Sequence, residues 1–393
     1  MTGNIAIDVA IGLVFIYLLY SLLATIIQEL IASYFSFRSK ILERAIYRML
    51  EDGEKFNHRF EGIFHLFKKT KNDGDAQTPS EQFYKHPLIK FLAEGKFRNK
   101  PSYINSSTFS KVIVDLLRGN KATSADNISS LISKALKDEK LMWGNIPIAE
   151  ETLNYLNSIW TDAQGDVDKF KATLEDWFDE TMERASGWYK NYTQIVLFFI
   201  GLVLAIFFNV DTIKITNKLA KDPKLREQVV QQADAFVKAH PNLDQELNNE
   251  IEENKKIFFA FESKTKKTND SLSKIKEIEK RDSITIANYK KAKLKRDELL
   301  NRADSLVKGD IRKVNNSMGL GYENFKSNYK KWTDYVYLPF GWLITALAIS
   351  LGAPFWFDLL NKLMKLRSSV STETTAENNS KKTSKEEKTK AVG

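Results

Sequence analysis

Cysteine is absent from this chain of 393 residues. Its absence excludes disulfides, thiolate zinc sites, iron–sulfur clusters and cysteine nucleophiles. Histidine is scarce, with four residues, and the sequence motifs of phosphate-binding loops, dinucleotide-binding turns, serine hydrolases and zinc peptidases do not occur. We therefore expect no catalytic residue, no bound metal and no cofactor, and the sequence offers no support for an enzymatic activity.

Basic residues are missing from the start of the chain. Residues 1–4, MTGN, carry no lysine or arginine, whereas a secretory signal peptide begins with a basic stretch and ends at a small-residue cleavage site. The apolar block that follows is also too long for a signal peptide. We expect this block to stay in the protein as a membrane span.

Over the whole chain, by contrast, positive charge is in surplus, with a formal net charge of +9. Such a surplus suits nucleic acids or anionic lipid headgroups. It is spread along the chain, and no nucleic-acid-binding motif accompanies it. We therefore expect no nucleic-acid partner and take the lipid bilayer as the first partner.

Three long apolar blocks stand out against a mean hydropathy of −0.35. The first, residues 5–27, would reach roughly 34 Å as a helix, enough for a bilayer core of ~30 Å. Because its pattern continues, we predict transmembrane helix 1 with an interfacial extension over 5–37. The second and third spans are predicted at 193–213 and 337–363. Aromatic residues crowd the ends of the second and third blocks, as in interfacial belts: Trp188, Tyr189, Tyr192, Trp332, Tyr335, Tyr337, Trp356 and Phe357.

The distribution of basic residues predicts an orientation. Basic residues follow the first and third spans, and none precedes the first: Arg38, Lys40, Arg44 and Arg48, then Lys362, Lys365 and Arg367. The positive-inside rule then places the N-terminus outside and the C-terminus inside, in a bacterial cytoplasmic (inner) membrane. Residues 38–190 become cytoplasmic and 214–334 periplasmic. The second loop is also rich in lysine, but long loops translocate largely regardless of charge.

Both predicted soluble parts read as helical, which makes the chain an all-α membrane protein with three transmembrane helices. Residues 38–190 form a cytoplasmic helical domain in which Asp166 is a helix N-cap. Residues 214–334 form a helical hairpin or short coiled coil, with a helix after Pro223. The near-heptad positions are Leu243, Leu247 and Ile251, and Leu300, Ala303, Val307, Asp310 and Val314. The apolar-poor tail, 368–393, is predicted to be disordered.

Residues 53–71 leave three interpretations open. Five apolar residues, Phe56, Phe60, Ile63, Phe64 and Phe67, share one helical face, and His58, Glu61 and His65 share the opposite one. The segment could be a core helix with a solvated face, or an amphipathic helix lying in the membrane interface. A metal site on the three polar residues matches no known ligand pattern.

Polar residues gather at the ends of the spans. Asp8, Asn209 and Asp211 lie at the predicted outer boundary, and Glu29 and Asp358 at the inner one. Ionisable residues in spans are candidates for function, although boundary carboxylates commonly pair with nearby lysine or arginine. We keep both interpretations for these five residues.

Small residues predict how the spans pack. Gly201 and Ala205 form a small-xxx-small pair in the second span, and Gly352 ends such a pair in the third. Pro354 follows directly and is predicted to kink the third span near its inner end.

The sequence also resembles a known family. The runs WFDETMERASGWYKNYTQIVLFFIGLVLAIFFNVDT, residues 177–212, and GWLITALAISLGAPFWFDLLNKLMKLR, residues 341–367, resemble a widespread family of uncharacterised bacterial inner-membrane proteins. YKHPLIKFL (84–92) and KPSYI (100–104) are similar to it as well. The lysine-rich stretch around 240–320 looks like an addition to the family pattern. The resemblance implies the topology and no activity.

Three functional hypotheses follow. The leading one is a non-enzymatic membrane scaffold or assembly factor, with further copies of the chain, or a protein bound through the periplasmic loop or the cytoplasmic domain, as partners. The alternative is an oligomeric channel or transporter component that uses the boundary carboxylates. The third is a hydrolase that uses His58, Glu61 and His65.

Overall fold

The computed structural model describes residues 4–35, 37–52, 78–92, 100–120, 127–243, 245–247, 294, 296–323, 325, 329 and 332–369. Within these residues the chain is helical almost throughout, which confirms the all-α class. The described strands are β1 (Lys140–Leu141) and β2 (Ile146–Pro147), which pair antiparallel. They form a short hairpin around the turn at Gly144 and Asn145, both of which adopt positive φ angles.

The chain divides into two compact units. Unit 1 draws on Met1–Leu30, Thr193–Ile251 and Lys295–Gly393, and the described helices of unit 2 lie within Ile31–Tyr192. Helices α1 (Ile5–Phe35) and α9 (Val167–Phe207) contribute residues to both units. Apart from Leu294, the described residues of the predicted loop 214–334 belong to unit 1, together with the apolar helices.

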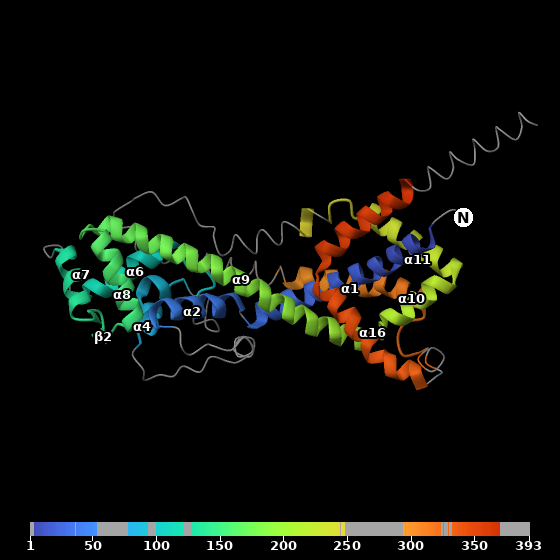
Figure 1. The fold of residues 1–393 in the computed structure, drawn as a ribbon, viewed down its shortest axis with the longest axis horizontal. Coiled ribbons are helices and arrows are strands. Elements are labelled where there is room, and N and C mark those ends of the chain that lie inside the picture. Colours follow the sequence, from blue (N-terminus) through green and yellow to red (C-terminus); the bar gives the residue numbers. More distant parts are fainter. Residues whose placement is uncertain are drawn as a thin grey trace, which may run out of the picture. The chain divides into compact units, whose positions relative to one another are not determined.

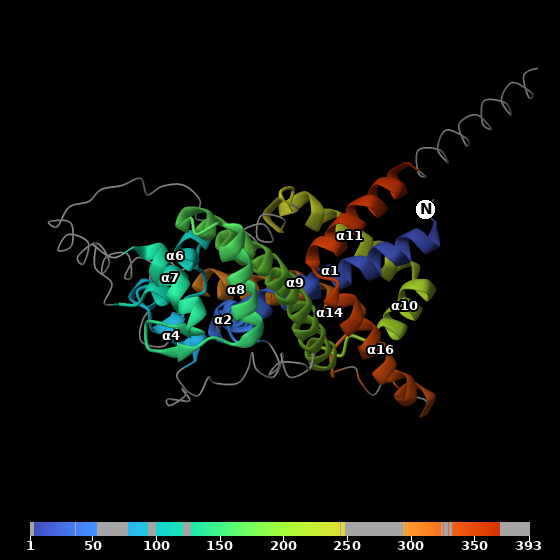
Figure 2. The same ribbon diagram turned by 60° about the vertical axis from the view of Figure 1, so that its left-hand side comes forward.

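Unit 2 contains α2 (Phe37–Leu50), α4 (Pro79–Lys85), α5 (Pro87–Lys90), α6 (Ser106–Arg118), α7 (Ile128–Lys137), α8 (Glu150–Asp162) and the first part of α9. Figure 1 and Figure 2 label all of these helices except α5. Its core is aromatic: the rings of Phe83 and Phe178 lie 5.6 and 4.8 Å from that of Phe109, and all three side chains are buried. Such burial stabilises a helical domain mainly through the apolar area removed from water.

Local sequence signals set several helix starts in unit 2. The side chain of Asn105 accepts a hydrogen bond from the backbone N–H of Thr108 at 2.7 Å. Asp166 accepts from the backbone N–H groups of Asp168 and Lys169 at 2.9 and 3.1 Å, immediately before α9. These bonds satisfy donors that have no partner within a helix. The predicted N-cap at Asp166 is therefore confirmed.

Unit 1 is built around the first part of α1. Its other elements are the end of α9 from Thr193, α10 (Thr212–Lys221), α11 (Pro223–Ala239), the π-helix η2 (Val307–Ile311), α14 (Arg312–Met318), α16 (Trp332–Ser350) and the helix Ala353–Ser369. Helix α10 packs against α16 and α11, and α11 packs against α14. The helix predicted after Pro223 is confirmed as α11.

The coiled coil stays a prediction. Val314 of the heptad pattern is buried, but Leu300 is half exposed. The π-helix η2 also changes the helical period in the middle of the pattern, at Val307–Ile311, and a coiled coil needs an even repeat.

Two helices, α1 and α9, are long and apolar enough to cross a membrane. Helix α16 and the helix Ala353–Ser369 pass the same test together, but they are bent by 93°. The chain is therefore a membrane protein with two candidate spans, or three if the bent pair counts as one. The predicted span 337–363 is not a single straight helix.

Gly352 sits at this bend. Its φ is +86°, a left-handed conformation that glycine adopts without steric cost. Pro354 lies in the first turn of the following helix, where proline is tolerated. The predicted break is present, but the chain turns by 93° at Gly352 and does not merely kink at Pro354.

Several predictions lie outside the described residues. They include the three interpretations of 53–71, with His58, Glu61 and His65, and the tail from residue 370 onward. Ser368 and Ser369, the last described part of the tail, belong to the helix Ala353–Ser369.

Candidate functional site

The loop between α9 and α10 forms the centre of the candidate site. Helix α9 ends at Phe207, so Asn209 and Asp211 lie beyond it and not inside a span ending at 213. Asn209 has a φ of +50°, and the backbone N–H groups of Asn209 and Val210 donate to the carbonyls of Ile206 and Ala205. This is a Schellman C-cap with asparagine in the left-handed position.

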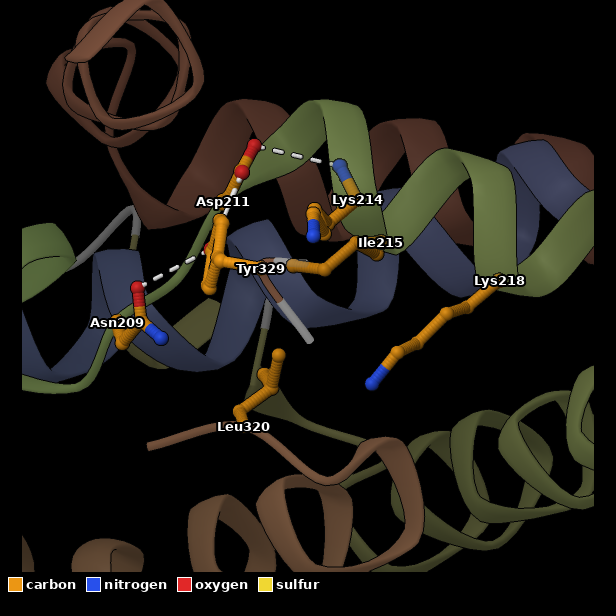
Figure 3. A pocket seen from close by; sticks show the side chains of 7 residues that line it. All are labelled: Asn209, Asp211, Lys214, Ile215, Lys218, Leu320 and Tyr329. Atoms are coloured by element: carbon orange, nitrogen blue, oxygen red, sulfur yellow. Dashed lines mark hydrogen bonds between the residues drawn. The ribbon is translucent and has the colours of Figure 1, made fainter. Parts of the chain in front are cut away.

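Asp211 begins the next helix directly. Its Oδ1 accepts from the backbone N–H groups of Ile213 and Lys214 at 2.9 and 3.2 Å, which caps α10. Its Oδ2 accepts from the hydroxyl of Tyr329 at 3.2 Å. The carboxylate is 3% exposed, so these bonds stand in for the water it has lost. Figure 3 shows Asp211 and Tyr329 pointing toward each other.

A glycine of α16 makes room for this carboxylate. A Cβ atom built on Gly341 would overlap with Asp211 Oδ1. Only a residue without a side chain can hold α16 this close to the loop. Gly341 therefore sets the approach of α16 to the start of α10.

Asn209 joins three segments. Its side-chain Nδ2 donates to the carbonyl of Gly321 at 3.2 Å. Its Oδ1 lies 3.3 Å from both the hydroxyl of Tyr329 and Nε1 of Trp342. Asn209 is 2% exposed, and its partners come from the turn after α14, the segment before α16, and α16 itself.

A chain of hydroxyl groups extends the network into α1. The Tyr17 hydroxyl lies 2.9 Å from Thr212 Oγ1, which lies 2.8 Å from Thr345 Oγ1. Thr345 Oγ1 lies 2.7 Å from the carbonyl of Val210. If each hydroxyl donates onward in this order, every proton and each acceptor finds a partner. The network thus ties α1, α10 and α16 together without an unsatisfied hydroxyl.

Two lysines flank the carboxylate. Lys214 Nζ lies 3.7 Å from the centre of the Tyr329 ring and 3.6 Å from Asp334 Oδ2. Lys218 Nζ donates to the carbonyl of Met318 at 2.7 Å. Together with Asn209, Asp211, Ile215, Leu320 and Tyr329 they line a small pocket, drawn in Figure 3.

Burial shifts the ionisation of this group of residues. Desolvation raises the pKa of Asp211, and hydrogen bonds from Lys214, Tyr329 and Ile213 oppose the shift in part. Desolvation, followed by repulsion from Lys214, lowers the pKa of Lys218. Burial and then the neighbouring Asp211 raise the pKa of Tyr329. A carboxyl group held this way can take up a proton more readily than an exposed aspartate.

The other predicted carboxylates lie elsewhere. Asp358 is exposed and pairs with Lys362 at 2.6 Å, one turn along its own helix. Glu29 is half-buried in α1. The structure describes all five predicted boundary residues, and of these only Asn209 and Asp211 lie together.

Asp8 has a partner that the predicted topology does not allow. Its Oδ1 accepts from Arg367 Nε at 2.9 Å. Further along, the ring of Tyr17 packs on that of Trp356 at 4.8 Å, so the helix Ala353–Ser369 runs antiparallel to the first part of α1. The predicted topology puts Asp8 outside and Arg367 inside, whereas an ion pair requires both on one side of a bilayer.

Small residues mark the contact between α9 and α16. A Cβ on Gly201 would lie 3.0 Å from Ile349 Cβ and 3.2 Å from the carbonyl of Ala346. Ala205, one turn later, is fully buried. Gly201 thus lies at a close helix–helix contact of the kind that small residues permit in membranes.

Unit 2 holds a separate buried pair. His86 Nε2 lies 3.6 Å from Asp115 Oδ2, and both side chains are more than nine-tenths buried. His86 Nδ1 accepts from the backbone N–H of Leu88, so Nε2 carries the proton. Desolvation would raise the pKa of Asp115, but His86, Lys111 and Arg118 together lower it. The pair ties the turn before α5 to α6.

Most of the residues that form the hydrogen-bond network around Asn209 and Asp211 were not predicted from the sequence. Tyr329 and Trp342 carried no local signal, because aromatic residues near span ends fit an interfacial belt equally well. Tyr17 lies in the middle of the first apolar block, where nothing distinguishes it from its apolar neighbours. Gly341 and Thr345, spaced by one helical turn in an apolar segment, could have indicated a polar packing face. Among the residues that the structure describes, no cluster of three or more histidine, aspartate or glutamate side chains could hold a metal ion.

Replacing Gly341 by alanine tests the central contact. The added methyl group would push α16 away from Asp211, and overpacking of this kind costs about 1–3 kcal/mol. We expect Gly341→Ala to lower the midpoint of unfolding of the full-length protein in detergent. Gly309→Ala is the control, because its Cβ meets nothing within 4 Å. Equal midpoints for the two variants would contradict the contact.

The pair between Asp8 and Arg367 predicts the sidedness of the two ends. Since the chain has no cysteine, the single variants Ile5→Cys and Ser369→Cys give clean labelling sites. We expect a membrane-impermeant maleimide to label both from the same side of sealed vesicles. Both must react after detergent is added. Labelling from opposite sides would restore the predicted three-span topology.

Comparison with known proteins gives no relative for this chain: no family model, no curated protein and no solved structure matches it. Functional assignment therefore rests on the residues and contacts described above.

Proposed function

We propose that this chain is a non-enzymatic membrane scaffold or assembly factor, located in a bacterial inner membrane. It would hold a helical domain, unit 2, next to the membrane and present it to a protein partner or to further copies of the chain. The observation that carries the proposal is that unit 2 has its own aromatic core, while its chain continues through α1 and α9 into the apolar helices of unit 1.

The surface of unit 2 offers a place for a protein contact. Leu88 and Leu92, at and just after α5, are 40% and 44% exposed. Neighbouring exposed apolar side chains with polar residues at their rim, here Lys85 and Lys90, are typical of a protein-interaction site. The proposed partner would bury these leucines.

Chemical crosslinking in native membranes, followed by purification of the full-length chain, tests this function. We expect a defined oligomer or a stoichiometric partner, and we expect Leu88→Asp with Leu92→Asp to abolish it while the protein stays in the membrane. The control Lys85→Gln with Lys90→Gln removes charge at the same face and should weaken the contact only modestly. A monomer with no crosslinked partner would exclude the scaffold.

A second candidate is an oligomeric channel or transporter component, because Asp211 is a buried carboxylate with a raised pKa beside two lysines and next to apolar helices. Two or three spans in one chain would need several copies to enclose a pore. Reconstituted vesicles should then conduct ions or protons, and Asp211→Asn, which retains a helix cap, should reduce the flux. Impermeable vesicles containing a defined oligomer would rule this candidate out.

A further inference from the structure

The two faces of α16 are inverted relative to a helix in water. Its buried face carries small or polar residues, Gly341, Thr345 and Ala346 among them, and Thr345 is fully buried. Its outward face carries large apolar residues: Phe340 is 57%, Leu343 42% and Leu347 53% exposed. A helix at a protein–water surface shows the opposite arrangement.

The end of α9 shows the same inversion. Gly201 and Ala205 face inward, where Gly201 meets Ile349 of α16. Phe199, Val203 and Phe207 face outward and are 56%, 64% and 70% exposed. Spacings of four residues place these three side chains on one face of the helix. Since the two helices pack through their small residues, their bulky faces are left outside that contact.

Helix α1 is the most apolar of the three but is mostly covered by protein. In its most apolar window, 78% of the residues are buried, against 39% for α9. The covering side chains come from helices with polar outer faces: Phe236 of α11 lies 5.6 Å from the Phe15 ring, and Leu219 of α10 adjoins Gly12. Hydropathy alone would assign α1 the largest lipid contact.

We propose that the lipid-contacting surface of unit 1 is formed by the outward faces of α9 (Phe199, Val203 and Phe207) and α16 (Phe340, Leu343 and Leu347), and that α1 is an interior helix. This inference deepens the proposed function, because it rests on the anchoring of unit 1 in a membrane and names the surface that provides it. The occupant is the acyl-chain region of a lipid bilayer.

The composition of the surface favours lipid over a second copy of the chain. Helices associate within membranes through small residues that allow close approach and through hydrogen bonds between helices. In unit 1 the small residue Gly201 and the hydrogen-bonding residues Thr345 and Asn209 already contact other parts of the same chain. The outward faces carry bulky apolar side chains that suit acyl chains. Trp332, at the start of α16, is 81% exposed, as expected of an interfacial residue.

Spin labels on single cysteines of the full-length protein in liposomes test this assignment. The sites are Val203→Cys and Leu347→Cys on the proposed surface, Ala24→Cys inside α1, and Ser130→Cys on unit 2 as the water-exposed reference. We expect the collision ratio of molecular oxygen to a water-soluble nickel chelate to be several-fold higher at the first two sites than at Ser130. We expect Ala24 to be shielded from both reagents.

Two results would overturn the proposal. Strong nickel collision at Val203 and Leu347 would place the surface in water. Shielding from both reagents at these sites, unchanged when the lipid-to-protein ratio is raised, would place a second copy of the chain there. Neither result depends on a partner for unit 2, so the lipid surface and the scaffold function can fail separately.

Discussion

The carboxylate of Asp211 caps α10 with one oxygen and accepts from Tyr329 with the other. Because Gly341 has no side chain, α16 can lie against it. Only Val210 separates Asn209, which caps the end of α9, from Asp211, which caps the start of α10. The direction of α10 relative to α9 is therefore set at Asp211. A buried carboxylate without these bonds would be strongly destabilising.

The hydroxyl chain from Tyr17 to Thr345 extends the same principle. Its hydroxyl groups hydrogen-bond one another at 2.8 to 2.9 Å, so the polar groups of three helices have their partners inside unit 1. Large apolar side chains then remain for the outer faces of α9 and α16. The polar network and the apolar exterior are two results of one packing arrangement, and such an arrangement is stable where the surrounding solvent is hydrocarbon.

Local signals in the sequence predicted local structure well. Asp166 and Pro223 mark helix starts because capping depends on neighbouring residues only, and three apolar blocks indicated the membrane segments. The path through the third block was not predictable in detail, because both a straight span with a kink and a 93° turn suit the run GAPF. The residue that decides between them, Gly352, has a positive φ that no periodicity reveals.

Contacts between residues that are far apart along the chain could not be predicted from the sequence. Asp211 was predicted as a boundary residue, but Tyr329 is 118 positions away along the chain, and aromatic belts explain such a tyrosine equally well. The pair between Asp8 and Arg367 spans 359 positions. The positive-inside rule counts basic residues without their partners, so it placed these two on opposite sides.

The packing of α9 on α16 through small residues is the central claim, and a disulfide tests it most directly. The Cβ positions of residues 201 and 349 lie 3.0 Å apart. A disulfide needs about 3.5–4.5 Å between its Cβ atoms, so a small outward shift of the two helices would admit the bond. In this cysteine-free chain, Gly201→Cys with Ile349→Cys should form an intramolecular disulfide on mild oxidation in membranes, seen as a faster-migrating monomer. No crosslink, or a crosslinked dimer alone, would contradict the account.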